Sequence, residues 1–309
     1  MESIRVFCPA SVANVSCGFD VLGFCLGPIG DEMVVHKSQQ KGIRITKIEG
    51  QNLPTDPLKN VAGVAAQALI DEHPVSYGFD IEIYKNIKPG SGIGSSAASA
   101  AGAVFAINEL IGKPYNRHEL VQFAMAGEKL ASGSAHADNL APVLLGGFTL
   151  VRCNDTLDII TLPSPKDLYA SLLHPKIELK TAHARAILKE HITLKQGIQQ
   201  WGNLGAFVSA LYTEDYELLS RAMVDKVIEP ARAMLIPEFE SIRETALKAG
   251  ALGSGISGSG PSIYALSKGK TQAQKVSQAM LNATRNLAID VDIHLSPINQ
   301  KGITILETK

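Results

Sequence analysis

The sequence predicts an α+β protein with two domains, and three observations support this fold class. Apolar patterns typical of strands alternate with longer patterns typical of helices in both halves of the chain. The 309 residues exceed one average domain and can bury a sizeable core. Gly146-Gly147 and then Pro163-Ser164-Pro165 interrupt the pattern, so we expect a boundary at 163–167 between domains 1–163 and 164–309.

The first half is expected to contain six strands and three helices. Short runs rich in β-branched and aromatic residues predict strands at 4–9, 33–36, 43–48, 79–84, 147–153 and 157–162. Longer periodic runs predict helices at 60–71, 95–110 and 119–131. The last two strands flank Asn154-Asp155, so we expect them to pair with each other.

The second half repeats this mixture with more helix. Strands are expected at 171–173, 263–266, 290–295 and 303–306. Helices are expected at 181–191, 197–212, 215–224, 237–248 and 272–286. Because strands and helices are interleaved in each half, we expect two α+β units packed side by side.

The composition is that of an ordinary soluble globular protein, with 45% apolar and 19% charged residues. Lysines and arginines number 29 against 30 acidic residues, which gives a net charge of −1. No stretch is densely basic, so we expect neither nucleic acid nor a membrane surface as partner.

The cysteines and the N-terminus predict a reducing compartment. Cys8, Cys17, Cys25 and Cys153 form no Cys-x-x-Cys pair, which favours small buried thiols over a disulfide framework or a zinc site. The N-terminus has neither the long apolar core nor the cleavage site of a signal peptide. We therefore expect the protein in the cytoplasm.

Residues 89–102, PGSGIGSSAASAAG, form the most informative segment of the chain. Glycines let a backbone turn tightly and approach a ligand closely, because no Cβ intervenes. A helix that begins at Ser95 or Ser96 directs its unpaired N–H groups and the positive end of its dipole toward the glycine loop. The segment therefore predicts a phosphate-binding loop.

Four other interpretations of this segment fit less well. It is too rich in glycine, serine and alanine for a membrane span, and residues 103–110 continue as a helix, which a flexible linker would not do. A P-loop requires a lysine after the last glycine. A dinucleotide fingerprint, nominally present at 92–97, requires a second strand ending in an acidic residue, whereas another helical pattern follows Pro114.

Two further glycine-containing segments, 9–23 and 250–262, suggest that several loops line one cleft. Together with residues 89–102, and in this order, they resemble the three motifs of the GHMP small-molecule kinases, with Ile93 in place of a leucine in the central motif. The resemblance spans nearly the whole chain. It implies an N-terminal domain like part of ribosomal protein S5, a ferredoxin-like C-terminal domain, and an active site in the cleft between them.

Three narrower segments, 54–60, 136–142 and 225–232, resemble the homoserine kinases within that family. This resemblance implies transfer of the γ-phosphoryl group of ATP to the side-chain hydroxyl of L-homoserine, with Mg²⁺ as cofactor, in threonine biosynthesis. It also implies a homodimer. A kinase for another alcohol such as shikimate or mevalonate, a catalytically inactive binding module and an NAD-dependent oxidoreductase are the competing interpretations.

With no P-loop lysine, loop N–H groups, the helix dipole and a metal ion must stabilise the transferred phosphoryl group. The resemblance implies that Ser96 and Glu128 hold Mg²⁺, which prefers oxygen ligands, although Glu128 taken alone also fits a solvated helix position. The implied nucleotide-binding residues are Asn60, Lys85, Pro89, Gly90, Ser91, Gly92, Ile93, Gly94, Ser95, Ser96, Gly258, Ser259 and Gly260.

A zwitterionic substrate needs an anion for its ammonium group and a cation for its carboxylate. Asp20 suits the ammonium group, and Arg185 and Arg232 suit the carboxylate because guanidinium is a planar bidentate donor. The resemblance implies these three residues, Asp20, Arg185 and Arg232, and adds Asn14, His136 and Asn139 to the same pocket. Each of these residues also has a purely structural interpretation, as a turn cap or a surface ion pair.

The proton acceptor is the open question of the reaction. Asp138 corresponds in position to the aspartate that acts as general base in several GHMP kinases. In the homoserine kinases, which this chain resembles, that position is taken by the residue matching Asn139, whose amide cannot accept a proton. We expect Asp138 to have a structural or secondary role, with the γ-phosphate itself accepting the proton and catalysis resting on positioning.

Overall fold

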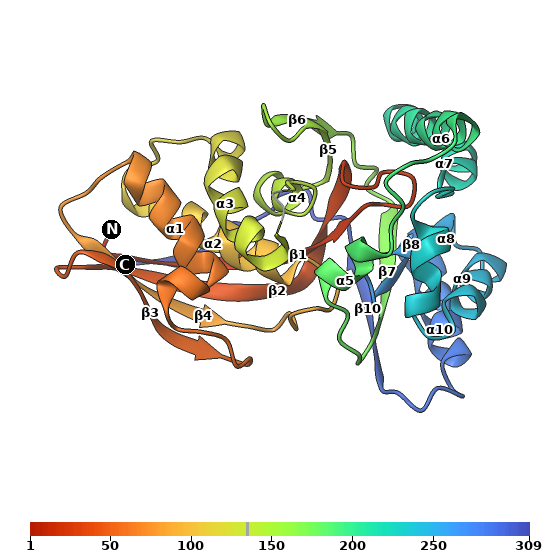
Figure 1. Cartoon of the computed structure of the whole chain (residues 1–309). Helices are drawn as coiled ribbons and strands as arrows, with labels where there is room; N and C mark the ends of the chain where they lie inside the picture. Colours follow the sequence, from red (N-terminus) through yellow and green to blue (C-terminus); the bar gives the residue numbers. More distant parts are fainter. Residues whose placement is uncertain (134–135) are drawn as a thin grey trace.

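The computed structural model describes residues 1–133 and 136–309. These residues form two sheets with helices packed against them (Figure 1). The first sheet has seven strands in the order β11-β1-β2-β4-β3, with β5 pairing with β2 and β6 pairing with β5. The second has four strands in the order β10-β7-β9-β8. The mixed content confirms the α+β class.

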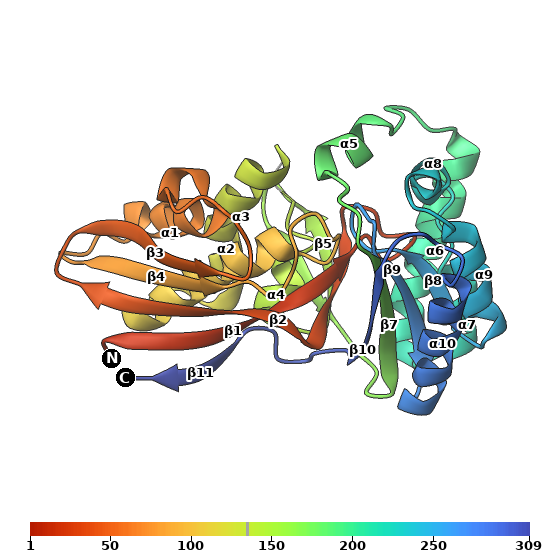
Figure 2. The ribbon, with the colours of Figure 1, turned by 90° about the horizontal axis from the view of Figure 1, so that it is seen from below.

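The first sheet is antiparallel except between β3 and β4, which are parallel. The last strand of the chain returns to this sheet and pairs with β1, so both termini lie at the same end of the molecule (Figure 2). The strands are β1 (Ser3–Ala13), β2 (Leu22–Ser38), β3 (Gly42–Glu49), β4 (Gly78–Tyr84), β5 (Phe148–Cys153), β6 (Asp158–Leu162) and β11 (Thr304–Thr308).

One face of this sheet is covered by α1 (Val61–Glu72), α2 (Ser95–Leu110) and α3 (Arg117–Ser132), with α4 (Leu140–Leu145) beside them (Figure 1). Helix α2 is the central one, and every residue from Ala97 to Leu110 is buried. Its alanines and its one glycine permit this close packing, since a Cβ on Gly102 would lie 2.5 Å from Cys8 Sγ. The glycine loop of residues 89–94, predicted to bind phosphate, is therefore attached to a helix that is buried from Ala97 onward.

The second sheet is antiparallel and consists of β7 (Leu168–Pro175), β8 (Gly253–Ile256), β9 (Ile263–Lys268) and β10 (Val291–Pro297). Residues from α9 and α10, including Phe239, Ile242 and Val276, form a second core with Leu173 of β7. The helices of this half are α5 (Thr181–Ala186), α6 (Leu194–Thr213), α7 (Tyr216–Ala222), α8 (Glu229–Arg232), α9 (Phe239–Lys248) and α10 (Lys270–Ala283).

Most predicted elements are present, and the differences have local causes. The bounds of α2 coincide with the predicted helix 95–110, and β5 pairs with β6 as expected. The helix expected at 181–191 ends at Ala186. Helices α4 and α8 and strand β8 were not predicted, because four to six residues are too few for a periodic pattern.

The chain passes from the first sheet to the second between β6, which ends at Leu162, and β7, which begins at Leu168. The boundary at 163–167 stays a prediction. All four cysteines are free thiols, and Cys153 is only partly buried, unlike the other three. Among the described helices, none combines the length and apolar character that a bilayer crossing requires.

Candidate active site

A cavity of about 410 Å³ is lined by residues from both halves of the chain. This volume lies in the range of small-molecule sites, roughly 300–1,000 Å³. Its wall is formed by the phosphate loop, the start of α2, the loop between β1 and β2, the loop before α4, helix α5 and the loop after β8. Segments separated by more than 200 residues in sequence thus meet at one cavity.

The phosphate loop places three glycines in the left-handed region before α2, with φ of 71° at Gly90, 82° at Gly92 and 71° at Gly94. A Cβ on Gly92 would lie 2.5 Å from the carbonyl oxygen of Gly260, and one on Gly94 would lie 2.3 Å from Ser11 Oγ. Among the described residues, no side chain caps the N-terminus of α2. Its first N–H groups and dipole are therefore oriented for an anion.

The glycine-rich loop after β8 fixes the glycine loop of residues 89–94 through two serine side chains. Ser257 Oγ donates a hydrogen bond to the carbonyl of Gly92 at 2.7 Å, and Ser262 Oγ donates one to the carbonyl of Ser91 at 2.7 Å. Both serines are fully buried. Because the carbonyls of Ser91 and Gly92 are held by these serines, the loop conformation depends on the second half of the chain.

Ser96 and Glu128 lie together at the cavity wall, where Ser96 Oγ donates a 2.8 Å hydrogen bond to Glu128 Oε2. Burial raises the pKa of the Glu128 carboxyl, and the hydrogen bond from Ser96 opposes this shift. The pair presents oxygen atoms at the first turn of α2, next to the anion site. This donor set fits a hard divalent cation such as Mg²⁺.

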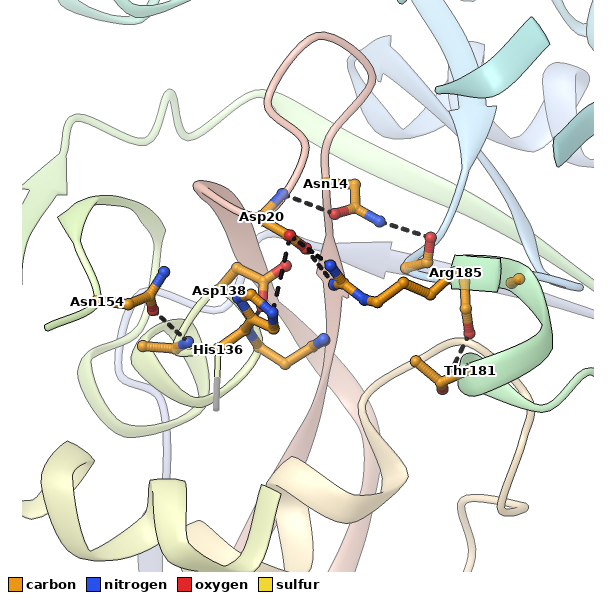
Figure 3. Close-up of polar contacts among 12 residues, drawn as sticks. Asn14, Asp20, His136, Asp138, Asn154, Thr181 and Arg185 are labelled. Carbon is orange, nitrogen blue, oxygen red and sulfur yellow. Dashed lines mark hydrogen bonds and ion pairs between the residues drawn. The ribbon is translucent and has the colours of Figure 1, made fainter. Parts of the chain in front are cut away.

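Asp20 is the centre of the charged part of the cavity (Figure 3). Its carboxylate accepts two hydrogen bonds from the Arg185 guanidinium, at 3.0 and 2.8 Å. His136 Nε2 lies 3.8 Å from Asp20 Oδ2, and the Asn14 side chain accepts a 3.0 Å hydrogen bond from the Asp20 amide. The predicted ammonium-binding and carboxylate-binding groups thus neutralise each other in this structure.

Arg232 approaches the same region from α8 and is 3% exposed. Its Nε donates to the carbonyl of Ala184 at 3.0 Å, and its Nη1 donates to that of Gly258 at 3.2 Å. The guanidinium groups of Arg232 and Arg185 lie over the Phe19 ring, 5.1 and 5.4 Å from its centroid. Burial, reinforced by the charge of Arg185, lowers the pKa of Arg232 to about 10, so it remains a cation.

Three residues of the segment before α4 complete the wall: His136, Asp138 and Asn139. Burial, together with the nearby Asp20 and Glu128 carboxylates, raises the pKa of Asp138 to about 7. Burial lowers the pKa of His136, so this ring is largely neutral at pH 7. Asn139 Oδ1 accepts a 2.8 Å hydrogen bond from Ser11 Oγ and is thereby fixed in orientation.

Asn60, Ser91, Ile93 and Gly260, four of the residues predicted to bind nucleotide, do not line the cavity, whereas Lys85 lines it with its charge already paired. Asn60 caps α1 by accepting from the amide of Ala62. Ser91 and Ile93 are buried within the glycine loop. Gly260 belongs to the loop after β8, where its amide donates to the carbonyl of Ser257. Lys85 reaches the cavity wall, but its ammonium group forms a buried ion pair with Asp31 and donates to the Ser95 carbonyl at 3.0 Å.

The other predicted residues line the cavity. They are Asn14, Asp20, Pro89, Gly90, Gly92, Gly94, Ser95, Ser96, Glu128, His136, Asp138, Asn139, Arg185, Arg232, Gly258 and Ser259. Sequence reasoning did not single out Phe19, although an aromatic residue beside Asp20 in a motif was a usable signal. It also missed Thr181 and Lys180, which carry no motif and reach the cavity only through the fold.

Comparisons with known proteins agree with this arrangement. The family profile described as GHMP kinases N terminal domain matches residues 60–147, and the one described as GHMP kinases C terminal matches residues 207–286. A homoserine kinase of Chloroherpeton thalassium is 46% identical over 319 residues, covering 99% of this chain and 100% of that relative. One of Xylella fastidiosa is 38% identical and covers 98% of this chain and 94% of its own length.

Solved structures show the same relationship. The crystal structure of homoserine kinase from Cytophaga hutchinsonii matches with a TM-score of 0.96 at 48% identity, covering 99% of this chain and 98% of that one. L. major mevalonate kinase matches with a TM-score of 0.70 at 18% identity, which shows a shared fold alone. On the full-length identity to its curated relatives, this chain belongs to the homoserine kinases, a family within the GHMP kinases.

Proposed function

We propose that this protein transfers the γ-phosphoryl group of ATP to the side-chain hydroxyl of L-homoserine, forming O-phospho-L-homoserine and ADP. The observation that carries this function is the cavity itself, in which an unoccluded helix N-terminus and glycine loop lie beside a carboxylate and two guanidinium groups. One part suits a triphosphate and the other suits an amino acid.

The charged part of the cavity favours a zwitterion over other alcohols. An α-amino acid can replace the Asp20–Arg185 ion pair with two new pairs, its ammonium group on Asp20 and its carboxylate on Arg185 and Arg232. No buried charge is then left unpaired. Mevalonate has a carboxylate but no ammonium group, so it would leave Asp20 without a cation of its own.

ATP is expected to place its phosphates against the loop of residues 89–96. Backbone N–H groups and the dipole of the buried helix α2 stabilise charge on the phosphate oxygens without any reorganisation during the reaction. Leu53 and Val61 provide apolar lining nearby, which suits a purine base. Gly258 and Ser259, from the second half of the chain, line the cavity together with this loop.

Ser96 and Glu128 would hold Mg²⁺, and the 2.8 Å separation of their oxygen atoms is compatible with shared coordination. When bound, the ion offsets the negative charge of the phosphates. Among the described residues, no group of three or more histidine, cysteine, aspartate or glutamate side chains could hold a metal alone. Mg²⁺ commonly takes one or two protein ligands and its remaining ligands from phosphate and water.

Asn139 and His136 would orient the homoserine hydroxyl for in-line attack, because both line the cavity and the Asn139 side chain is held by Ser11. We retain the γ-phosphate as the proton acceptor and Asp138 as a structural group. We also propose that the protein acts in the cytoplasm as a homodimer, which light scattering on the purified protein would test.

The deciding experiment measures ADP release from Mg-ATP with L-homoserine, L-serine, L-threonine, shikimate and mevalonate. Turnover selective for L-homoserine is expected, and Asp20→Asn should raise the KM for it by at least about tenfold while leaving the KM for ATP near its original value. Turnover on shikimate or mevalonate alone would contradict the zwitterion site. ATP binding without turnover on any alcohol would favour a binding module.

A further inference from the structure

Asp225 lies outside the cavity, in the segment that leads into α8, and its carboxylate accepts three hydrogen bonds from backbone amides. Its Oδ1 accepts from the amides of Val227 and Ile228 at 2.8 and 3.0 Å, and its Oδ2 accepts from the amide of Glu229 at 2.8 Å. It is 9% exposed. One carboxylate therefore fixes three successive peptide units at the start of this short helix.

The same peptide units fix Arg232. The carbonyl of Ile228, whose amide is held by Asp225, accepts the amide of Arg232 at 3.1 Å. From there the Arg232 side chain extends to the carbonyls of Ala184 and Gly258. A helix of four residues has too few internal hydrogen bonds to be stable by itself. Its orientation, and hence that of Arg232, depends on the carboxylate that holds its first turn.

Gln200 of α6 connects this carboxylate to the loop between β1 and β2, which forms another part of the cavity wall. Its Nε2 donates to Asp225 Oδ1 at 3.0 Å and to the carbonyl of Cys17 at 3.1 Å, while its Oε1 accepts the amide of Lys226 at 2.9 Å. Cys17 belongs to the loop that carries Phe19 and Asp20. Gln200 thus ties the segment that carries Arg232 to the loop that carries the carboxylate of the charged site.

We propose that Asp225 is a positioning residue that sets the distance between Arg232 and Asp20, and so adapts the site to the spacing of the ammonium and carboxylate groups on one α-carbon. Gln200 supports it by joining these two parts of the cavity wall. This inference rests on the proposed function, because it assigns the substrate carboxylate to Arg232. It adds a specificity role for a buried carboxylate that touches neither substrate nor nucleotide.

The test compares two ligands that differ only in the carboxylate. L-Homoserine carries it, whereas 3-aminopropan-1-ol has the same ammonium group and hydroxyl without it. Asp225→Asn replaces one acceptor oxygen with an NH₂ group that faces backbone donors. We expect it to raise the KM for L-homoserine about tenfold, because the lost hydrogen bonds release Arg232. The inhibition constant of 3-aminopropan-1-ol and the KM for ATP should change by less than about twofold.

Two further measurements separate positioning from general stability. Asp215 accepts the amides of Glu217 and Leu218 at the start of α7, so Asp215→Asn makes the same chemical change at a helix that does not reach the cavity. It should lower the unfolding midpoint without affecting the KM for L-homoserine. In a background of Arg232→Ala, Asp225→Asn should have little further effect, since the two residues act on one contact.

If Asp225→Asn does not fold, Gln200→Leu decides the question, with an expected rise of about threefold in the KM for L-homoserine and none for ATP. An unchanged KM for L-homoserine, or an equal loss of affinity for both ligands, would overturn the inference. If the unsubstituted protein fails to phosphorylate L-homoserine at all, the proposed function itself is wrong, so the two failures are distinguishable.

Discussion

Asp138 combines two properties that point in different directions. Its carboxyl lines the cavity and has a pKa of about 7, raised chiefly by burial, which is the value expected of a general base. However, its Oδ1 accepts the amide of Asn139 at 3.1 Å, which directs this atom at the backbone. The geometry favours a residue that shapes the segment carrying Asn139, and the pKa follows from burial near Asp20 and Glu128.

Asp138→Asn should therefore keep kcat for L-homoserine within about threefold of the original, whereas loss of a general base costs roughly 10²–10⁴-fold. Steady-state rates from pH 6 to pH 9, for the variant and the unsubstituted protein, provide the measurement. A loss of more than a hundredfold in kcat with an unchanged KM for L-homoserine would make Asp138 the base.

Lys85, which was predicted to bind nucleotide, has a buried carboxylate partner that the sequence did not indicate. A lysine at a strand end before a glycine loop suggests a phosphate contact, but here its ammonium group is 1% exposed and paired with Asp31. It also donates to Ser95 and Ser99, so all three of its hydrogens have partners. Asp31 in turn accepts the amides of Asn86 and Ile87. The pair joins β2 and β4 to the first turn of α2.

Lys85→Met should destabilise the protein by about 3–5 kcal/mol, because it leaves the Asp31 carboxylate buried without a cation. Combining it with Asp31→Asn should recover part of this loss. Urea unfolding measures both, and Lys248→Met, which removes an exposed ion pair with Glu244, should have little effect. Equal stability of the Lys85 variant and the original would mean that water already screens the pair.

At the scale of elements, the phosphate loop and α2 act as one unit. The sequence predicts the helix because small residues continue without interruption after the glycines, and its bounds agree with the structure. The loop conformation has two causes, the left-handed φ values of its glycines and the contacts with the loop after β8. Only the first of these is visible in the sequence.

Gly92→Ala tests the second cause. The new methyl group would lie 2.5 Å from the Gly260 carbonyl oxygen and 2.7 Å from that of Ser257, and both are backbone atoms that cannot easily move. We expect the KM for ATP to rise at least about tenfold, in addition to a loss of stability of about 1–2 kcal/mol from the left-handed φ.

The matched control is Gly112→Ala at the end of α2, where φ is 94° and the space for a methyl group is open. It carries the conformational cost without the clash, so the KM for ATP should stay unchanged while stability falls. Equal effects of the two substitutions on the KM for ATP would show that the contact between the two loops is unimportant.

At the scale of the whole molecule, buried acids make stability depend on pH. Burial raises the pKa of Glu229 to about 7, and its nearest cation, Arg243, lies 3.6 Å away and only partly opposes this shift. Between its ordinary pKa of about 4.5 and this value, the folded state holds a proton that the unfolded state has released. Stability therefore falls as pH rises through this range.

Glu229→Gln should flatten this dependence, because the amide stays neutral. From pH 5 to pH 8, the midpoint of thermal unfolding should decrease more for the original protein than for the variant. Some slope should remain in the variant, since the raised pKa of Asp138 acts in the same direction. Parallel curves for the two proteins would show that Glu229 titrates alike in the folded and unfolded states.

The sequence predictions were accurate where interactions between residues close in the chain determine the structure. Long uninterrupted helical segments such as α2 were predicted well, and so was the pairing of β5 with β6. Helix α8 was missed although it carries Arg232, because its stability comes from Asp225 and from its neighbours rather than from a pattern. The ion pair of Lys85 was missed because Asp31 is 54 residues away.

The sequence by itself determined the fold class and the glycine loop with its helix, because these depend on composition, spacing and backbone freedom. The set of charged residues suited to a zwitterion was implied by the resemblance of its motifs to the homoserine kinases. The tertiary structure decided which of those residues face the cavity and which hold it in shape. Asp20 meets Arg185 across 165 residues, and Gly92 meets Ser257 across the same separation. Contacts over such distances arise only when two sheets and their loops pack together, since no local pattern encodes them.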